Sequence, residues 1–477
     1  MTLQAFTAAD SAPWVDRHRG HANRPSRAPE PPLAGTTSIR ALRIGVWCDY
    51  GATLVPTEGI GVFVYSLVAG LLSLPDQLEI VMLVRPGDEH VVEHLRKRGR
   101  GRLRVIPEVR CAPAWMRFTD RARAAKRLVE QALQRPPLRN RFALGPVRCL
   151  LNKLLRRTLR GLGRLDRSMQ WQAQAEMAKA AACDVWLIPY GDFPIPLDFP
   201  SVFAVHDLVC IHFPDMWEQA EQQRLETHFR RRAAEATLCA CMSLFIRDRD
   251  LIGVLGLSAA KARMVAPAPP VDLVAADASG SPLPLDRPYI FYPAGFRSYK
   301  NHRVLIEAIH SLRQAGHDAI DLVFTGSGPM PEDLQQLVQR YQLTDRVHVL
   351  GCVDRSNLAT LYRRAVATMI PALYEQGSFP IYEALRYGCP VACSAIPPFQ
   401  EQCALLGAAM LYFDPHNAGA VAEMIRLIRG KRETIRERQR LASRAIWKRT
   451  WKEAAREWLA LFREAAETGR AANRSAA

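Results

Sequence analysis

Residues 375–394, EQGSFPIYEALRYGCPVACS, decide how the rest of the chain is interpreted. Seven residues separate Glu375 from Glu383, and Pro380 between them suits the first position of a helix because its nitrogen carries no hydrogen. The spacing predicts Glu375 on a loop and Glu383 one turn inside the helix. The start of a helix directs unpaired N–H groups toward an anion. The stretch therefore predicts a site for a diphosphate with a sugar on one side and a ribose on the other, and the residues expected to line it are Gly377, Ser378, Phe379 and Pro380.

A second segment, residues 292–302 (YPAGFRSYKNH), places Lys300 at the end of a glycine-containing loop after an expected strand at 289–292. A lysine at the start of a helix is unfavourable for the helix dipole. We therefore favour a functional cation that contacts a departing phosphate over a solvated surface lysine. Three further residues are expected to bind the same diphosphate ligand: Gly295 and Arg297 in this loop, and Gly326 after the next expected strand.

Short apolar runs alternate with helical stretches along most of the chain. The expected strands are 43–47, 78–84, 103–106, 185–189, 202–205, 237–243, 289–292, 321–325, 347–350, 367–370 and 391–393. The expected helices include 63–74, 301–315, 332–341, 357–364 and 380–387. This alternation predicts an α/β protein with doubly wound parallel sheets.

The length of 477 residues favours two cores, and a Pro/Ala/Ser-rich linker at 266–288 separates them. We expect a disordered leader at 1–40 and an N-terminal Rossmann-like acceptor domain at 41–278. A C-terminal Rossmann-like nucleotide-sugar domain is expected at 279–445, followed by a crossover helix and a tail at 446–477. The helix is expected to end before a frayed segment at 464–477.

A helical, arginine-rich insertion is predicted at about 111–182, where a short connection would normally follow a strand. Residues 138–167 contain nine Lys or Arg and one acidic residue, interleaved with leucines at helical spacing. Two interpretations stay open. The segment either packs on the N-terminal domain with a solvated basic face, or lies on the anionic inner surface of a membrane.

The segment SVFAVHDLVCIHFPD puts His206 just past a strand, at the end where open α/β sheets bind ligands. A buried structural histidine is the alternative. Gly59 and Gly61 lie in a glycine-rich loop that we expect to approach a phosphate or an acceptor.

The net charge and the lengths of the apolar runs limit the class of protein to which this chain can belong. The chain carries a net charge of +17, which suits anionic partners, but no nucleic-acid-binding motif accompanies the charge. No apolar run is long enough to span a bilayer, and residues 1–38 lack the apolar region of a signal peptide. We expect a protein that is cytoplasmic or peripheral on the inner face of the membrane, with reduced cysteines, no metal site and no nucleic acid as partner.

Together these motifs resemble the family-4 glycosyltransferases, retaining enzymes of the GT-B fold, from about residue 43 to 463. The family signature EGFGLPxLEA is similar to EQGSFPIYEA here, followed by GCPVACS and PPFQE. Gln376, Gly377 and Ser378 depart from the usual residues, and Gly295 stands where many members have an arginine. The form YPAxxxxxKNH is similar to a branch with many mannosyl- and rhamnosyl-transferring enzymes of surface polysaccharide assembly.

The resemblance implies two Rossmann-like domains facing a cleft and transfer of a hexose, with mannose favoured, from a nucleotide sugar such as GDP-mannose. The acceptor would be a glycan or a lipid-linked sugar, and same-face attack would retain the anomeric configuration. The resemblance also implies that His206 faces the transferred sugar, that Glu375 contacts its hydroxyls and that Glu383 binds the ribose. Lys300 would replace a metal ion. Two alternatives stay open: a catalytically degenerate GT-B binding or scaffold protein, and a nucleotide-sugar epimerase of the same fold.

Overall fold

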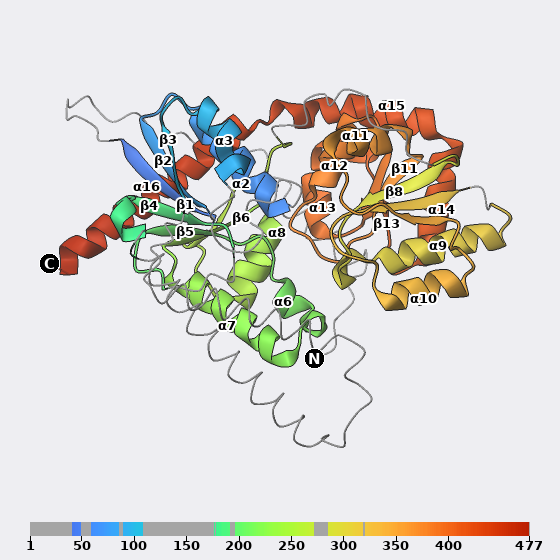
Figure 1. The fold of residues 1–477 in the computed structure, drawn as a ribbon, viewed down its shortest axis with the longest axis horizontal. Coiled ribbons are helices and arrows are strands. Elements are labelled where there is room, and N and C mark those ends of the chain that lie inside the picture. The colour runs from blue at the N-terminus through green and yellow to red at the C-terminus, as the bar shows by residue number, and fades with distance from the viewer. Residues whose placement is uncertain are drawn as a thin grey trace, which may run out of the picture.

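A computed structural model describes residues 41–48, 59–84, 89–107, 176, 178–190, 196–270, 285–317 and 320–476. These residues form two parallel sheets that lie side by side, each covered by helices (Figure 1). The first sheet has the strand order β3-β2-β1-β4-β5-β6-β7, and the second has the order β10-β9-β8-β11-β12-β13. The α/β prediction with two doubly wound sheets is therefore confirmed.

The first sheet is built from short strands, which are largely buried except at the two edges, β3 and β7. They are β1 (Leu42–Trp47), β2 (Leu78–Val84), β3 (Leu103–Pro107), β4 (Val185–Ile188), β5 (Ser201–Ala204), β6 (Leu238–Cys241) and β7 (Ala262–Met264). Its helices are α2 (Gly59–Leu72), α3 (Glu89–Arg98), α6 (Val209–His212), α7 (Gln219–Glu235) and α8 (Leu244–Ile246), and a π-helical segment follows at Arg247–Val254.

The second sheet follows the strand order 3-2-1-4-5-6 of a dinucleotide-binding fold when its strands are counted from its own first strand. Its strands are β8 (Tyr289–Pro293), β9 (Asp321–Thr325), β10 (Val347–Val349), β11 (Ala367–Ile370), β12 (Val391–Ser394) and β13 (Leu411–Phe413). Its helices are α9 (His302–Gln314), α10 (Glu332–Arg340), α11 (Arg355–Arg364), α12 (Phe379–Arg386), α13 (Pro397–Gln402), α14 (Ala418–Gly430) and α15 (Arg432–Ala442).

Each sheet buries apolar side chains on both faces, as parallel sheets with helical crossovers require. The strand β2 reads LEIVMLV, and six of its seven residues are buried. Helix α9 turns one apolar stripe toward the second sheet, formed by Val304, Leu305, Ile306, Ala308, Ile309 and Leu312. The expected strands and helices are found, with ends that shift by a few residues.

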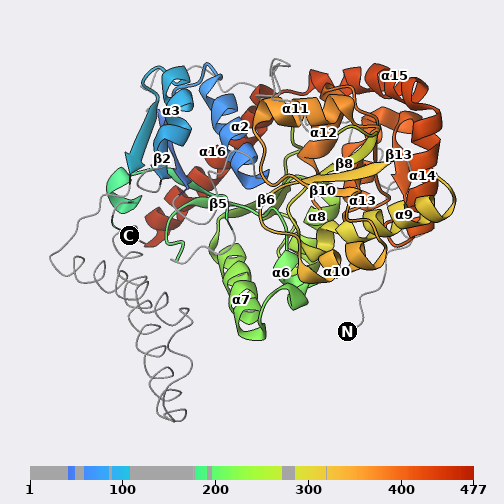
Figure 2. The same ribbon diagram turned by 45° about the vertical axis from the view of Figure 1, so that its right-hand side comes forward.

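The last helix, α16 (Trp451–Ala476), returns from the second domain and packs on the first (Figures 1 and 2). Trp458 is 1% exposed in the core of the first domain, with its ring 5.4 Å from that of Phe63. A side-chain carbon on Gly70 of α2 would lie 2.3 Å from the Trp451 carbonyl oxygen, so glycine allows the two helices to approach. The crossover helix is thus present.

The expected fraying at 464–477 is wrong, because α16 continues to Ala476. Ala465 and Ala466 are buried in the first domain. Arg463 pairs with Asp76, and Arg470 pairs with the carboxylate of Asp184, so contacts on both sides hold the helix beyond residue 463.

The predicted basic insertion, including residues 138–167, lies largely outside the described residues, as do the leader at 1–40 and most of the linker at 266–288. The interpretations of these segments stay predictions. The proposed domain boundaries also stay predictions.

Replacing Trp458 by alanine should destabilise the first domain by about 3–5 kcal/mol, because a large buried ring is removed and the space is only partly refilled. Urea unfolding followed by circular dichroism measures the change. The exposed Arg456 on the same helix supplies the matched control, Arg456→Ala, which should stay within about 0.5 kcal/mol of the wild type. Equal midpoints for the two variants would show that α16 does not stabilise this core.

Candidate functional site

The second sheet reverses its strand order between β8 and β11, and the loops after these two strands carry Lys300 and Glu375. In open α/β sheets this is the place where ligands bind, at the carboxyl ends of the strands. The ammonium of Lys300 donates to Oε1 of Glu375, so the two predicted residues meet directly. Their side chains are 22% and 15% exposed, so a ligand can reach the pair.

Lys300 is held by the residues that follow it. It closes a 3-10 turn at Ser298–Lys300, and Asn301 adopts a left-handed conformation with φ 55° and ψ 43° before α9 begins at His302. The Asn301 amide donates to the carbonyls of Pro371 (3.2 Å) and Pro415 (2.8 Å), after β11 and β13. Lys300 therefore precedes the helix rather than beginning it, and this correction follows from the left-handed turn at Asn301.

Burial and the partner's charge both shift the pKa values of this ion pair. The carboxylate of Glu375 raises the pKa of Lys300 above its usual range, despite the burial that acts against the ammonium. Burial raises the pKa of Glu375, and the Lys300 charge opposes that change. The Lys300 ammonium also lies 5.1 Å from the centre of the Tyr299 ring, a cation–π distance. The site thus keeps a fixed cation at the carboxyl ends of β8 and β11.

Glu383 lies in the second turn of α12, and Glu375 lies on the loop before that helix, as the spacing predicted. Tyr362 of α11 donates its hydroxyl hydrogen to Oε2 of Glu383 at 2.6 Å. Burial raises the pKa of Glu383, and the Tyr362 hydrogen bond opposes the change. One carboxylate oxygen is thereby oriented by the fold.

The start of α12 differs from the prediction in detail. The helix begins at Phe379, so Pro380 takes the second position. The Ser378 N–H, expected to be free for an anion, donates to Gln402 Oε1 at 2.7 Å, and the Gln402 amide donates to the Ser378 carbonyl at 2.8 Å. Gln402 therefore fixes the loop that carries Glu375, and a hydrogen bond from the Ser378 N–H to a donor phosphate is not supported by this geometry.

Two predicted donor-binding glycines lie against each other. A side-chain carbon on Gly326, which has φ +144°, would come within 2.5 Å of the Gly295 nitrogen. The loops after β8 and β9 can touch because position 326 lacks a side chain, and a side-chain carbon at position 295 would make a tight contact of 3.2 Å with the Ser327 carbonyl oxygen. Arg297 is exposed, and its guanidinium donates to the carbonyl of the preceding Phe296 at 3.4 Å. Packing thus accounts for both glycines, and their contact with a donor stays a prediction.

The first domain contributes His206, which follows β5. Its Nδ1 lies 3.0 Å from the Gln376 amide nitrogen, and Gln376 is the residue after Glu375. Burial lowers the pKa of His206 to about 4, partly offset by the Pro189 carbonyl, so the ring is neutral at pH 7. Its Nε2 is buried and has no hydrogen-bond partner among the described residues. The structure therefore brings His206 to the same loop as Glu375.

Further polar contacts join the two domains around this site. Tyr374 donates its hydroxyl hydrogen to Asp250 at 2.6 Å and accepts the Leu208 N–H at 2.8 Å. Asp250 is 0% exposed, and its other oxygen lies 2.9 Å from His212 Nε2. The Tyr374 side chain thus connects the loop before α12 to two segments of the first domain.

A second connection lies at α13 of the second domain. Glu401 accepts the N–H groups of Leu244 (2.7 Å) and Phe245 (3.2 Å) at the start of α8. Phe379, predicted to bind the donor, packs against the apolar cores of both domains. Its large apolar ring is used for packing between domains, which accounts for its position without a ligand.

The predicted glycine loop at 59–61 is instead the first turn of α2, since Gly59 begins that helix. Glycine is tolerated there because the first N–H groups of a helix have no partner within it. Phe63 in the same helix packs edge-on to His206, with ring centres 4.8 Å apart. Gly59 and Gly61 therefore lie near the His206 side of the site, and their phosphate or acceptor role stays a prediction.

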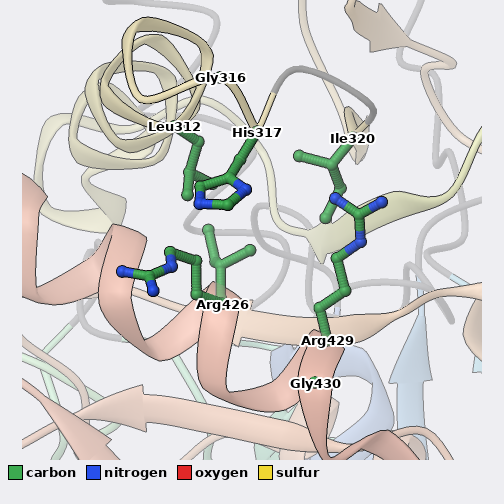
Figure 3. A pocket seen from close by; sticks show the side chains of 8 residues that line it. Leu312, Gly316, His317, Ile320, Arg426, Arg429 and Gly430 are labelled. Carbon is green, nitrogen blue, oxygen red and sulfur yellow. The ribbon is translucent and has the colours of Figure 1, made fainter.

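A separate hollow of about 470 Å³ lies between the ends of α9 and α14, where Arg426, Arg429 and His317 surround apolar side chains (Figure 3). Lys300 precedes the other end of α9, a helix of 13 residues and hence about 20 Å long. This hollow is distinct from the candidate site. Both arginines lie on α14, and Arg429 is in its last turn, where a cation interacts favourably with the dipole.

The described residues contain no group of three or more His, Cys, Asp or Glu side chains arranged to hold a metal ion. None of their helices combines the length and the apolar character needed to cross a membrane.

Sequence reasoning missed the residues that position the site: Asn301, His302, Tyr362, Tyr374, Gln376, Gln402 and Asp250. Asn301 and His302 stood in the quoted YKNH segment, and asparagine is one of the few residues that adopt a left-handed conformation readily. The partners of Gln376 and Tyr374 lie more than 100 residues away in sequence, so no local pattern could have identified them.

Comparison with known proteins agrees with this geometry. The family described as "Glycosyl transferases group 1" matches residues 276–446, which contain Lys300, Glu375 and Glu383. The O-antigen chain mannosyltransferase B of Escherichia coli is 31% identical over 138 residues, 29% of this chain and 35% of that protein. Each of the curated relatives is matched over less than half of its own length.

Solved structures match nearly the whole chain. Sucrose-phosphate synthase from Thermosynechococcus elongatus aligns with a TM-score of 0.57 at 21% identity, over 89% of this chain and 98% of that one. The Anabaena HepE protein in complex with UDP-glucose aligns with a TM-score of 0.56 at 12% identity, over 88% and 99% of the two chains. The chain therefore has the GT-B fold.

Buried His302 should make stability depend on acidity. Burial lowers its pKa to about 4, so the native state binds fewer protons than the unfolded state between pH 6.5 and 4. The contribution is fully present above pH 6.5 and is lost as the pH falls, by at most about 1.4 kcal/mol per pH unit. His302→Gln, which keeps an N–H for the Ala294 carbonyl, should lose stability less steeply in this range.

Urea midpoints of wild type and variant, measured from pH 7 to 4, give the difference in slope. Comparing the two proteins cancels the opposite contributions of buried carboxyl groups such as Glu375 and Glu401, whose pKa values burial raises. The exposed His317 supplies the control, His317→Gln. Parallel curves for wild type and His302→Gln would contradict the prediction.

Proposed function

We propose that this protein is a retaining glycosyltransferase of family-4 type, which transfers a hexose from a nucleotide sugar to a glycan or lipid-linked acceptor. One observation carries the proposal. Lys300 and Glu375 form a half-buried ion pair at the strand-order reversal of the second sheet, with Glu383 in the adjacent helix and His206 of the first domain beside them. The match of residues 276–446 to glycosyl transferases group 1 supports it.

The chemistry requires that charge be stabilised as the sugar leaves its diphosphate. Breaking the bond between the sugar and the phosphate oxygen leaves positive charge on the sugar and negative charge on the diphosphate. The Lys300 ammonium and the positive end of the α12 dipole stabilise the diphosphate. The Glu375 carboxylate binds sugar hydroxyls or the positive sugar. The acceptor hydroxyl attacks from the face that the diphosphate leaves, and its proton passes to the departing diphosphate oxygen.

Glu383 binds the ribose hydroxyls in this scheme. Its Oε2 already accepts a hydrogen bond from Tyr362, so the carboxylate is held in one orientation before the nucleotide arrives. No metal ion is required, because the lysine ammonium and the helix dipole supply the positive charge. Turnover is accordingly proposed to persist in EDTA, and a strict Mg²⁺ requirement would count against this part of the scheme.

Mannose is the favoured sugar and GDP-mannose the favoured donor. Two observations support mannose: the YPAxxxxxKNH segment, and the 31% identity over 138 residues to an O-antigen chain mannosyltransferase. Surface polysaccharide or lipopolysaccharide assembly is the proposed setting, in the cytoplasm or on the inner face of the membrane. The basic segment at 138–167 is proposed to contact anionic lipid there.

The donor can be identified by thermal shift with a panel of GDP-, UDP-, ADP- and dTDP-sugars. A ligand at about 100 times its Kd should add roughly 2.7 kcal/mol to the stability of the protein. We expect GDP-mannose to raise the melting temperature of the wild type. Glu383→Gln should respond much less, because the amide keeps an acceptor for the Tyr362 hydroxyl but loses the negative charge that binds ribose hydroxyls. A response to UDP-sugars alone would overturn the choice of donor, and a response to none would favour a degenerate binding protein.

Lys300→Ala should lower the transfer rate by about 10²- to 10³-fold, because it removes a preorganised cation from the departing phosphate. Release of nucleoside diphosphate in the presence of acceptor measures the rate. Lys452→Ala, at an exposed position on α16, is the matched control and should keep the wild-type rate.

Removing Lys300 also leaves Glu375 without its partner in a buried place. The double variant Lys300→Ala/Glu375→Gln separates this effect, because it removes both charges. A rate loss with an unchanged melting temperature in the double variant assigns the loss to chemistry. Near-normal turnover in Lys300→Ala would refute the role of this residue.

A further inference from the structure

Gln376 bridges the two domains at the candidate site. It follows Glu375 directly, stands where the resembled family usually has glycine, and is 6% exposed. Its Oε1 accepts the Met242 N–H of the first domain at 3.2 Å, and its Nε2 lies 3.0 Å from His206 Nδ1. Both partners of this side chain therefore belong to the first domain, whereas its backbone belongs to the loop that carries Glu375.

The contact with Met242 fixes which end of the amide faces the histidine. A backbone N–H can only donate, so the amide oxygen must face Met242 and the NH₂ group must face His206. A flipped amide would set two donors against each other. The Gln376 amide therefore donates to Nδ1 of His206, which has to be the ring nitrogen without a hydrogen.

A neutral imidazole carries its single hydrogen on the other nitrogen, so His206 has the Nε2–H tautomer. The Nε2 atom is buried and makes no hydrogen bond of good geometry among the described residues, while the Pro189 carbonyl lies near enough to the ring to raise its pKa. A buried donor without a partner costs free energy unless a ligand supplies an acceptor. The donor lies in the loop next to Asp207, whose carboxyl interacts electrostatically with both Lys300 and Glu375.

We propose that Gln376 is a positioning residue that acts through His206, by holding the ring with its hydrogen on Nε2 so that it donates to a hydroxyl oxygen of the transferred sugar. The inference rests on the proposed function and deepens it. Since Gln376 and His206 belong to different domains, the hydrogen bond forms only when the domains are together. The tautomer that donates to the sugar is therefore fixed only while the two domains are in contact.

The tautomer can be read directly from ¹⁵N-histidine-labelled protein at pH 7.5, with His206→Ala identifying the signal among the 12 histidines. The wild type should show hydrogen on Nε2 and none on Nδ1. Gln376→Met keeps the length of the side chain but removes the donor, so both tautomers should appear. In Gln376→Glu the carboxylate can only accept, so Nδ1 should carry a hydrogen. A wild-type signal with hydrogen on Nδ1 overturns the proposal.

Kinetics test whether the effect passes through His206. Gln376→Met should lower kcat/KM for the nucleotide sugar by about 10- to 100-fold, the cost of a mispositioned buried hydrogen bond. In the His206→Ala background the same substitution should have almost no further effect, because residues that act through one another are not additive. An additive loss, or full activity in Gln376→Met, overturns the proposal.

Tyr374→Phe supplies the matched control, because it removes interdomain hydrogen bonds to Asp250 and the Leu208 N–H without touching His206. It should leave the His206 signal unchanged and combine additively with His206→Ala. If the wild type transfers no sugar from any donor, the proposed function fails and the sugar-binding part of this inference fails with it. The histidine spectrum then still decides the tautomer, so the two failures are distinguishable.

Discussion

Lys300 and Glu375 form an ion pair across the point where the second sheet reverses its strand order, and the rest of the site is arranged around it. The chain runs from β8 and from β11 into helices that cover opposite faces of the sheet. The loops that follow these two strands lie at the edge of the sheet, where they can carry polar residues. Burying both charges costs free energy unless their geometry is held. Asn301 holds the lysine side and Gln402 holds the loop of the glutamate.

The same constraint extends across the two domains. The segment from Tyr374 to Gln376 supplies a hydroxyl, a carboxylate and an amide in three consecutive residues, and the first and third of these bond to the other domain. The carboxylate between them is directed to Lys300. One short segment therefore couples the charge of the site to the position of the first domain, and a shift of this backbone would change all three contacts together.

Local patterns were sufficient to predict most of the fold, because buried parallel strands read as apolar runs and the helices between them carry apolar stripes. They also identified Lys300, Glu375 and Glu383, since these lie in compact segments with recognisable turns. They failed where a residue's role depends on a distant partner. Phe379, predicted to contact the donor, also packs between the domains, and Gln376, a departure from the motif, bonds to His206.

Under the proposed function, polar contacts between the domains also determine how easily the domains separate to admit a donor. If the domains separate, the Tyr374 hydroxyl, the Gln376 amide and Nδ1 of His206 exchange protein partners for water, so each hydrogen bond costs only about 0.5–1.5 kcal/mol. An apolar interface of the same area would cost more to expose, because water offers no replacement for its contacts. These polar groups bond to water when the domains separate and to each other when the domains meet. The free energies of the two arrangements therefore differ little. A donor that bonds to groups from both domains then has enough differential affinity to draw them together.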